Sequence, residues 1–122
     1  MENEWEAEGT DAFAQWFQEL PIKEQVAVAR AVDLLEIYGP ALGFPHSSSV
    51  RGSRIPLREL RALRGQRPLR VLYVFDPRRT AILLLGGDKS GNARWYREHI
   101  SRAEALYAEY LGELNREGLL DG

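Results

Sequence analysis

The chain has 122 residues, of which 44% are hydrophobic and 28% are charged, and this composition is typical of one globular domain. It has no cysteine and only two histidines, which excludes a disulfide framework and disfavours a zinc or iron site built from protein ligands. No apolar run reaches the roughly 18 residues that span a bilayer, and the acidic N-terminus lacks the basic and apolar regions of a signal peptide. We therefore expect a single cytoplasmic domain over residues 1–122, without a cofactor or a membrane partner, whose tail is disordered from about residue 116.

The net charge of −2 hides an uneven distribution of charge along the chain. Residues 51–102 hold 13 of the 16 basic residues and 4 of the 18 acids, a net charge of +9. Residues 1–50 hold 2 basic residues and 9 acids, and residues 103–122 hold 1 and 5. Positive charge gathered in one segment can contact phosphates while acidic segments face elsewhere, so this distribution favours a polyanionic partner.

The N-terminal part of the chain predicts a short strand followed by two helices. Residues 4–8 alternate apolar residues with glutamates, as in a strand with one wet face. Thr10 suits an N-cap, and the apolar residues between positions 13 and 20 lie on one face of a helix. Pro21 ends this helix and suits the first position of a second one over residues 22–38, which a Gly-Pro pair terminates.

The middle of the chain predicts a long loop and then a β-meander. Residues 39–56 are rich in Gly, Pro and Ser, show no period and predict a loop. Residues 57–63, 69–75 and 80–85 predict three strands, because the first mixes apolar and charged residues and the others are apolar and rich in β-formers. The short gaps between them require antiparallel hairpins.

After a polar loop over residues 86–92, a helix is predicted from about Arg94 to Leu114, with one apolar stripe. The order β-α-α-β-β-β-α predicts an α+β fold. Its antiparallel four-stranded sheet would carry an N-terminal two-helix hairpin and a C-terminal helix.

The strand over residues 69–75 contains one arginine among apolar residues. Alternation places Arg70 on the same face as Leu72 and Val74. A guanidinium buried there without a partner would be costly. Either Glu59 forms a structural ion pair with Arg70, or Arg70 lines a cleft whose ligand is anionic, and the sequence leaves both readings open.

Other candidate residues lie at the end of the meander and the start of the last helix. Lys89 lies in a Gly-flanked loop that could approach a phosphate, although the same residues suit a plain polar turn. Tyr96 and His99 lie on adjoining parts of one helix face, where each could move protons or merely border the core. Trp95 lies off the apolar stripe and is expected to be exposed, either as a base-stacking platform or as a partner contact, and Arg94 adds charge at the same end.

Two further arginines, Arg78 and Arg79, occupy a hairpin tip, where solvated charges are expected. Taken together, the basic strand residues, Lys89 and the Tyr/His helix start suit metal-independent RNA cleavage. In that reaction the 2′-hydroxyl attacks the adjacent phosphate, fixed cations stabilise the phosphorane, and Tyr or His moves the protons.

The sequence resembles RelE/HigB-type toxins of bacterial toxin–antitoxin modules, especially their phage-derived branch. The resemblance covers about residues 4–114 and is carried by residues 50–54, 57–61, 67–75, 81–89 and 95–96. It implies an endoribonuclease that cleaves mRNA, usually in the ribosomal A site. It also implies silencing by a cognate antitoxin, which we expect to be a helix-turn-helix protein.

The resemblance also assigns residues to the site. It implies a catalytic set of Arg70 on the central strand, Lys89 after the last strand and Tyr96 on the last helix, with Trp95 as the one-residue alternative. His99 joins this set because of its position beside Tyr96. The resemblance implies RNA binding by Arg58, Arg61 or Arg64 on the first meander strand, and the start of the last helix adds Trp95 and Arg94 as RNA-binding candidates. The chain departs from many such toxins in being slightly acidic and in having only Arg where they carry Lys. A non-catalytic binding module for an antitoxin or RNA is the alternative, and a structural phage protein is a third reading.

Overall fold

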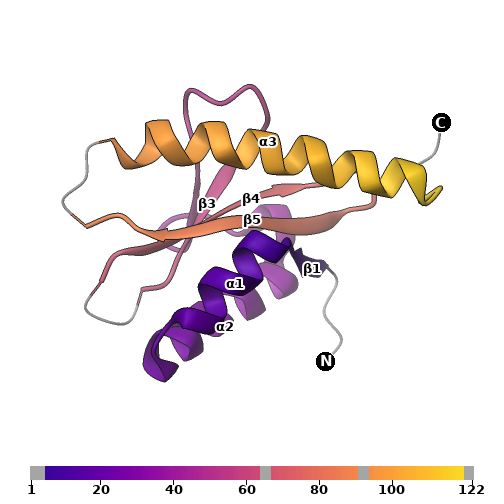
Figure 1. Cartoon of the computed structure of the whole chain (residues 1–122). Coiled ribbons are helices and arrows are strands. Elements are labelled where there is room, and N and C mark those ends of the chain that lie inside the picture. The colour runs from indigo at the N-terminus through magenta and orange to yellow at the C-terminus, as the bar shows by residue number, and fades with distance from the viewer. Residues whose placement is uncertain (1–4, 64–66, 91–93, 120–122) are drawn as a thin grey trace.

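The computed structural model describes residues 5–63, 67–90 and 94–119. Within them the elements are β1 (Glu6–Gly9), α1 (Asp11–Glu19), α2 (Ile22–Tyr38), the 3-10 helix η1 (Gly39–Ala41), β2 (Ser47–Ser49), β3 (Arg58–Arg61), β4 (Leu69–Phe75), β5 (Thr80–Asp88) and α3 (Trp95–Arg116). The strands form one sheet in the order β1-β5-β4-β3-β2. Figure 1 shows α3 across one face of this sheet and α1 with α2 against the other, which confirms the α+β class.

The sheet is mixed and five-stranded within the described residues, where the sequence predicted four antiparallel strands. The meander β3-β4-β5 is antiparallel as predicted. However, β1 pairs parallel with β5. The short gaps that predicted antiparallel pairing constrain only strands that follow one another directly in the chain, and β1 and β5 do not. The strand β2 pairs antiparallel with β3 at the sheet edge, inside the segment predicted as a loop. Three consecutive serines carry no apolar alternation, so the pattern did not reveal it.

The predicted start of α1 and the end of α3 both depend on caps. The hydroxyl of Thr10 accepts the backbone N–H of Phe13 at 3.1 Å, which confirms the N-cap. At the other end of the chain, Gly118 has a φ of 72°, and the N–H of Leu119 donates to the carbonyl of Leu114 at 3.0 Å. This is a Schellman motif that ends α3, and the structure describes the tail predicted to be disordered from about residue 116 as far as residue 119.

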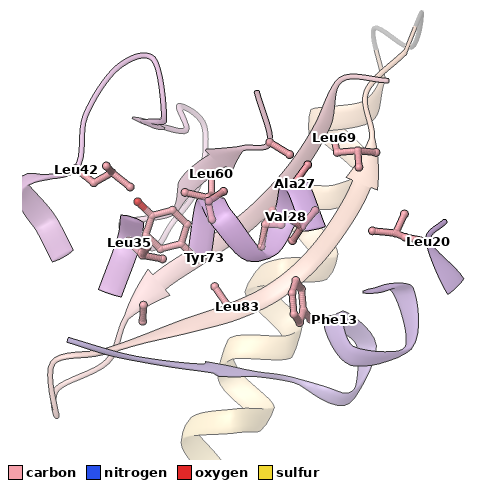
Figure 2. Close-up of a cluster of buried hydrophobic side chains, with 14 residues drawn as sticks. Phe13, Leu20, Ala27, Val28, Leu35, Leu42, Leu60, Leu69, Tyr73 and Leu83 are labelled. Atoms are coloured by element: carbon pink, nitrogen blue, oxygen red, sulfur yellow. The ribbon is translucent and has the colours of Figure 1, made fainter. Parts of the chain in front are cut away.

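Two hydrophobic clusters lie on the two faces of the sheet, and strand alternation divides β4 between them. In Figure 2 the side chains of α1 and α2 meet one face of the sheet. That cluster includes Phe13, Val28, Leu35, Leu60, Val71, Tyr73 and Leu83. The cluster beneath α3 includes Leu57, Leu72, Val74, Ile82, Leu84, Trp95 and Ala103. Full burial of each Leu or Ile contributes about 2 kcal/mol, so the two clusters fix both helical layers.

The hairpin tip between β4 and β5 is not simply solvated. Arg78 Nε donates to the fully buried carboxylate of Asp76 at 2.7 Å, and Arg78 Nη2 donates to Glu8 at 3.3 Å and to the hydroxyl of Tyr110 at 3.2 Å. Tyr110 also donates to Glu8, and burial together with this bond raises the pKa of Tyr110 to about 12. Arg78 therefore ties β1, the hairpin and α3 together, and its expected exposure is wrong; Arg79 is exposed.

Candidate active site

Two arginines and a glycine form one cross-strand row on the α3 face of the sheet. Arg61 lies opposite Arg70 in the β3–β4 pairing, and Arg70 lies opposite Gly87 in the β4–β5 pairing. A bulge in the middle of the β4–β5 pairing shifts the register by one residue. Because of this shift, Gly87 rather than Gly86 lies opposite Arg70. Directly opposed side chains point to the same face of a sheet. The side chain of Arg70 therefore projects toward α3 next to Gly87, which has no side chain.

A buried carboxylate lies next to this row. Glu59 is 4% exposed and accepts hydrogen bonds from Arg61 Nη2 at 2.7 Å, from the hydroxyl of Tyr96 at 2.5 Å and from Ser48 Oγ at 3.4 Å. The three donors come from β3, α3 and β2, so Glu59 joins the edge of the sheet to the first turn of α3. A buried carboxylate needs such partners, because an unpaired one would pay the full cost of desolvation.

Arg70 does not form a hydrogen bond or an ion pair with Glu59. Its Nη1 donates to the backbone carbonyl of Leu69 at 3.0 Å, and its Nε is buried without a hydrogen-bond partner. Among the described residues, no carboxylate oxygen lies within 4.0 Å of Arg70. The proposed Glu59–Arg70 ion pair is therefore wrong, because Arg61 takes that place. The reading that remains is a half-buried guanidinium available to an anionic ligand.

His99 lies over the same row with a defined tautomer. Its Nδ1 is 2.8 Å from the backbone carbonyl of Trp95, and a carbonyl oxygen can only accept. Nδ1 therefore carries the hydrogen, and in the neutral ring Nε2 is the acceptor. A Cβ built on Gly87 would lie 3.0 Å from His99 Nε2, which shows that this acceptor faces the sheet next to Arg70.

Trp95 is a packing residue and not an exposed platform. It is 2% exposed, and its ring stacks on His99 with centroids 4.2 Å apart and an interplanar angle of 14°. The expected exposure of Trp95 is therefore wrong. The first turn of α3 lies directly on Gly87, which brings even a residue off the apolar stripe into contact with the sheet.

Lys89 reaches the cluster from the end of β5. That strand continues to Asp88, so Gly86 and Gly87 belong to the sheet and not to the predicted loop. A Cβ on Gly86 would overlap the ring of Trp16, and one on Gly87 would press on α3, which explains why strand residues here are glycines. The Nζ of Lys89 lies 4.7 Å from the centroid of the Tyr96 ring, a cation–π contact.

The remaining predicted residues lie elsewhere. Arg58 points to the opposite face of the sheet, where its Nε lies 3.3 Å from both Ser47 Oγ and the Tyr73 hydroxyl, so it supports the α2 side. Arg94 is the residue before the first turn of α3. Arg64 lies outside the described residues. In the described parts of the chain, no three His, Cys, Asp or Glu side chains group as metal ligands, and no helix has the length and apolarity to cross a membrane.

The cluster is thus Glu59, Arg61, Arg70, Lys89, Tyr96 and His99. A groove of about 630 Å³ lies between α2 and the edge of the sheet. Of the six cluster residues, only Arg61 lines this groove. The cluster, where charged and titratable side chains from β3, β4, β5 and α3 come together, is the candidate site. Sequence reasoning treated Glu59 only as a partner for Arg70. The signal that could have placed it was the alternation that puts Glu59 and Arg61 on one face.

The fold is RelE-like. One chain of the crystal structure of the archaeal RelE–RelB complex from Pyrococcus horikoshii OT3 superposes with a TM-score of 0.57 and 18% identity, covering 72% of this chain and 98% of that one. At this identity the likeness shows the fold alone.

Sequence comparison defines the family more closely. Residues 15–108 match the family described as phage derived protein Gp49-like. A Mycobacterium tuberculosis protein named as toxin HigB2 is 38% identical over 112 residues, which are 89% of this chain and 55% of that protein. A second, named as toxin HigB3, is 45% identical over 99 residues, 80% of this chain and 85% of that protein. The chain belongs to the phage-derived Gp49-like family of RelE/HigB-type toxins. It spans only about half the length of HigB2.

Proposed function

We propose that this protein is the toxin of a toxin–antitoxin module and that it cleaves mRNA on translating ribosomes without a metal ion. The names of the HigB relatives support the first part of the proposal. The observation that carries the second part is the guanidinium of Arg70, which is half-buried, has no carboxylate partner among the described residues and lies beside an imidazole acceptor. Such an arrangement suits a ligand that is anionic and also gives up a proton.

The proposed reaction is attack of the ribose 2′-oxygen on the adjacent phosphorus, with cleavage of the bond to the 5′-oxygen. The products are a 2′,3′-cyclic phosphate and a 5′-hydroxyl end. His99 Nε2 accepts the proton of the 2′-hydroxyl, since its Nδ1 is fixed as a donor. Arg70 and Lys89 stabilise the charge that develops on the phosphorane.

The departing 5′-oxygen needs a proton, and Tyr96 is the second proton-moving group in the cluster. Its hydroxyl donates to Glu59 at 2.5 Å, so this carboxylate orients the phenol and can share its proton. Arg61, which donates to the same carboxylate, positions Glu59 and adds positive charge toward the RNA backbone.

Induced expression in bacteria tests the proposal. Wild-type protein should arrest growth and produce new mRNA 5′ ends that primer extension detects, whereas Arg70→Ala should do neither. Growth arrest without new 5′ ends would instead support the alternative, a non-catalytic module that binds an antitoxin or RNA. Normal growth with folded wild-type protein would contradict the proposed toxin function.

The proposal also includes a cognate antitoxin, in keeping with the toxin names of the relatives. We expect a helix-turn-helix protein encoded beside this gene. Co-expression of that protein should restore growth and should copurify the toxin. If growth stays arrested although both proteins are present and soluble, the neighbouring protein is not the antitoxin.

A further inference from the structure

Two buried donors in the candidate site lack a hydrogen-bond partner. Within the described residues, Arg70 Nε and Trp95 Nε1 are the buried side-chain nitrogen or oxygen atoms for which no partner exists. Buried polar groups in native proteins are almost always paired, and an exception at a site calls for an explanation. Both atoms are N–H donors, so the group that would satisfy them must be an acceptor.

The two donors lie on either side of Gly87. Arg70 is directly opposite Gly87 in the sheet, and its side chain leaves the sheet on the face that α3 covers. From above, Trp95 Nε1 lies 2.8 Å from the point where a Cβ of Gly87 would stand, and His99 Nε2 lies 3.0 Å from it. The absence of a side chain at Gly87 thus lets Trp95 Nε1 and His99 Nε2 approach the sheet next to the strand position of Arg70.

We propose that Trp95 is a substrate-binding residue whose indole N–H, together with Arg70 Nε, donates to one non-bridging oxygen of the scissile phosphate. This inference rests on the proposed function and deepens it. A non-bridging phosphate oxygen accepts two hydrogen bonds, and it becomes more negative as the phosphorane forms. The 2′-hydroxyl beside the same phosphate is the group whose proton His99 Nε2 would accept.

The role differs from base stacking, because the ring of Trp95 is already occupied by His99. Stacking between these rings, with centroids 4.2 Å apart, holds the imidazole in place. It leaves only the N–H edge of the indole for a ligand. The Trp95 side chain thus has two separate functions: its ring positions His99, and its N–H binds the phosphate.

The test replaces Trp95 by Phe, which keeps an aromatic ring but removes the donor, and compares cleavage of mRNA by purified protein on programmed ribosomes. We expect kcat to fall about 100-fold, the usual effect of removing one donor to a developing oxyanion. Thermal unfolding shows whether the variant is folded, because the smaller ring leaves a cavity where Trp95 is buried. Trp16→Phe is the matched control, since its ring packs on Gly86 at the other face of the sheet, and it should retain wild-type cleavage.

If Trp95→Phe does not fold, the isosteric analogue 3-benzothienylalanine at position 95 keeps the bicyclic ring and replaces only the N–H by sulfur. A folded variant of either kind that cleaves within twofold of wild type would overturn the inference and leave the proposed function intact. Wild-type protein that does not cleave at all would overturn the proposed function, and this inference with it.

Discussion

Replacement of Arg70 by Met should abolish activity without weakening the fold. Methionine keeps an unbranched apolar stem but removes the guanidinium. The variant loses the bond from Nη1 to the Leu69 carbonyl, which is worth about 0.5–1.5 kcal/mol. It also removes the unpaired buried Nε, whose burial costs about 1–3 kcal/mol. In addition, it removes the repulsion between Arg70 and the like charge of Arg61 directly opposite, which costs about 0.2–1 kcal/mol. The free energy of unfolding should therefore stay within about 0.5 kcal/mol of the wild-type value or rise, by at most about 3.5 kcal/mol.

The matched control is Arg78→Met at the hairpin tip. Arg78 donates to the fully buried carboxylate of Asp76, which would keep its backbone N–H donors from Arg78 and Thr80 but lose its cationic partner. Breaking a buried pair by removing one partner leaves an uncompensated charge, so we expect a loss of about 2–4 kcal/mol. The folded fraction of this variant should keep wild-type activity, because the tip lies outside the cluster.

Urea unfolding followed by tryptophan fluorescence measures both stabilities, and cleavage on programmed ribosomes measures both activities. The expected pattern is reciprocal: Arg70→Met is stable and inactive, and Arg78→Met is unstable and active. A loss of more than about 2 kcal/mol for Arg70→Met would refute the reasoning, because that size of loss indicates a satisfied structural guanidinium.

Two further predictions concern stability alone. Burial and the charge of Asp33 raise the pKa of Glu36, so wild-type stability should fall as the pH rises from 4.5 through that raised pKa. The variant Glu36→Gln should therefore be more stable than wild type at pH 7 and should lose this advantage below pH 4.5. Thermal unfolding measured over a pH series checks both expectations. Gly86→Ala should cost about 1–3 kcal/mol in urea unfolding because its Cβ would overlap the Trp16 ring, while Gly43→Ala should change stability by less than about 0.5 kcal/mol. Equal stability of the two Ala variants, or a Glu36→Gln curve parallel to wild type, would contradict the corresponding argument.

The layers of the fold could be predicted from local patterns. The apolar stripe of the last helix is confirmed, with Ala103 fully buried and its neighbours packed on the sheet. The alternation of β4 is confirmed as well, since Val71 and Leu72 belong to clusters on opposite faces. Both predictions succeed because helix and strand periods are properties of the chain itself and need no knowledge of distant partners.

The features that were missed depend on contacts between distant segments. Arg61, not Arg70, pairs with Glu59, because the pairing register and the side-chain directions are decided by the whole sheet. Trp95 is buried because a bulge in β5 turns Gly87, which has no side chain, toward α3. A bulge leaves no local signal in a run of leucines, so neither the burial of Trp95 nor the fixed tautomer of His99 could be read from spacing.

The central claim is that Arg70 serves RNA cleavage on the ribosome. The most direct measurement incubates purified protein with translating ribosomes that carry end-labelled mRNA, and compares wild type with Arg70→Met at equal folded concentration. The account predicts fragments with 5′-hydroxyl ends from wild type and a loss of at least about 100-fold in Arg70→Met. Fragments from the variant within twofold of wild type, or intact mRNA with folded wild-type protein, would contradict it.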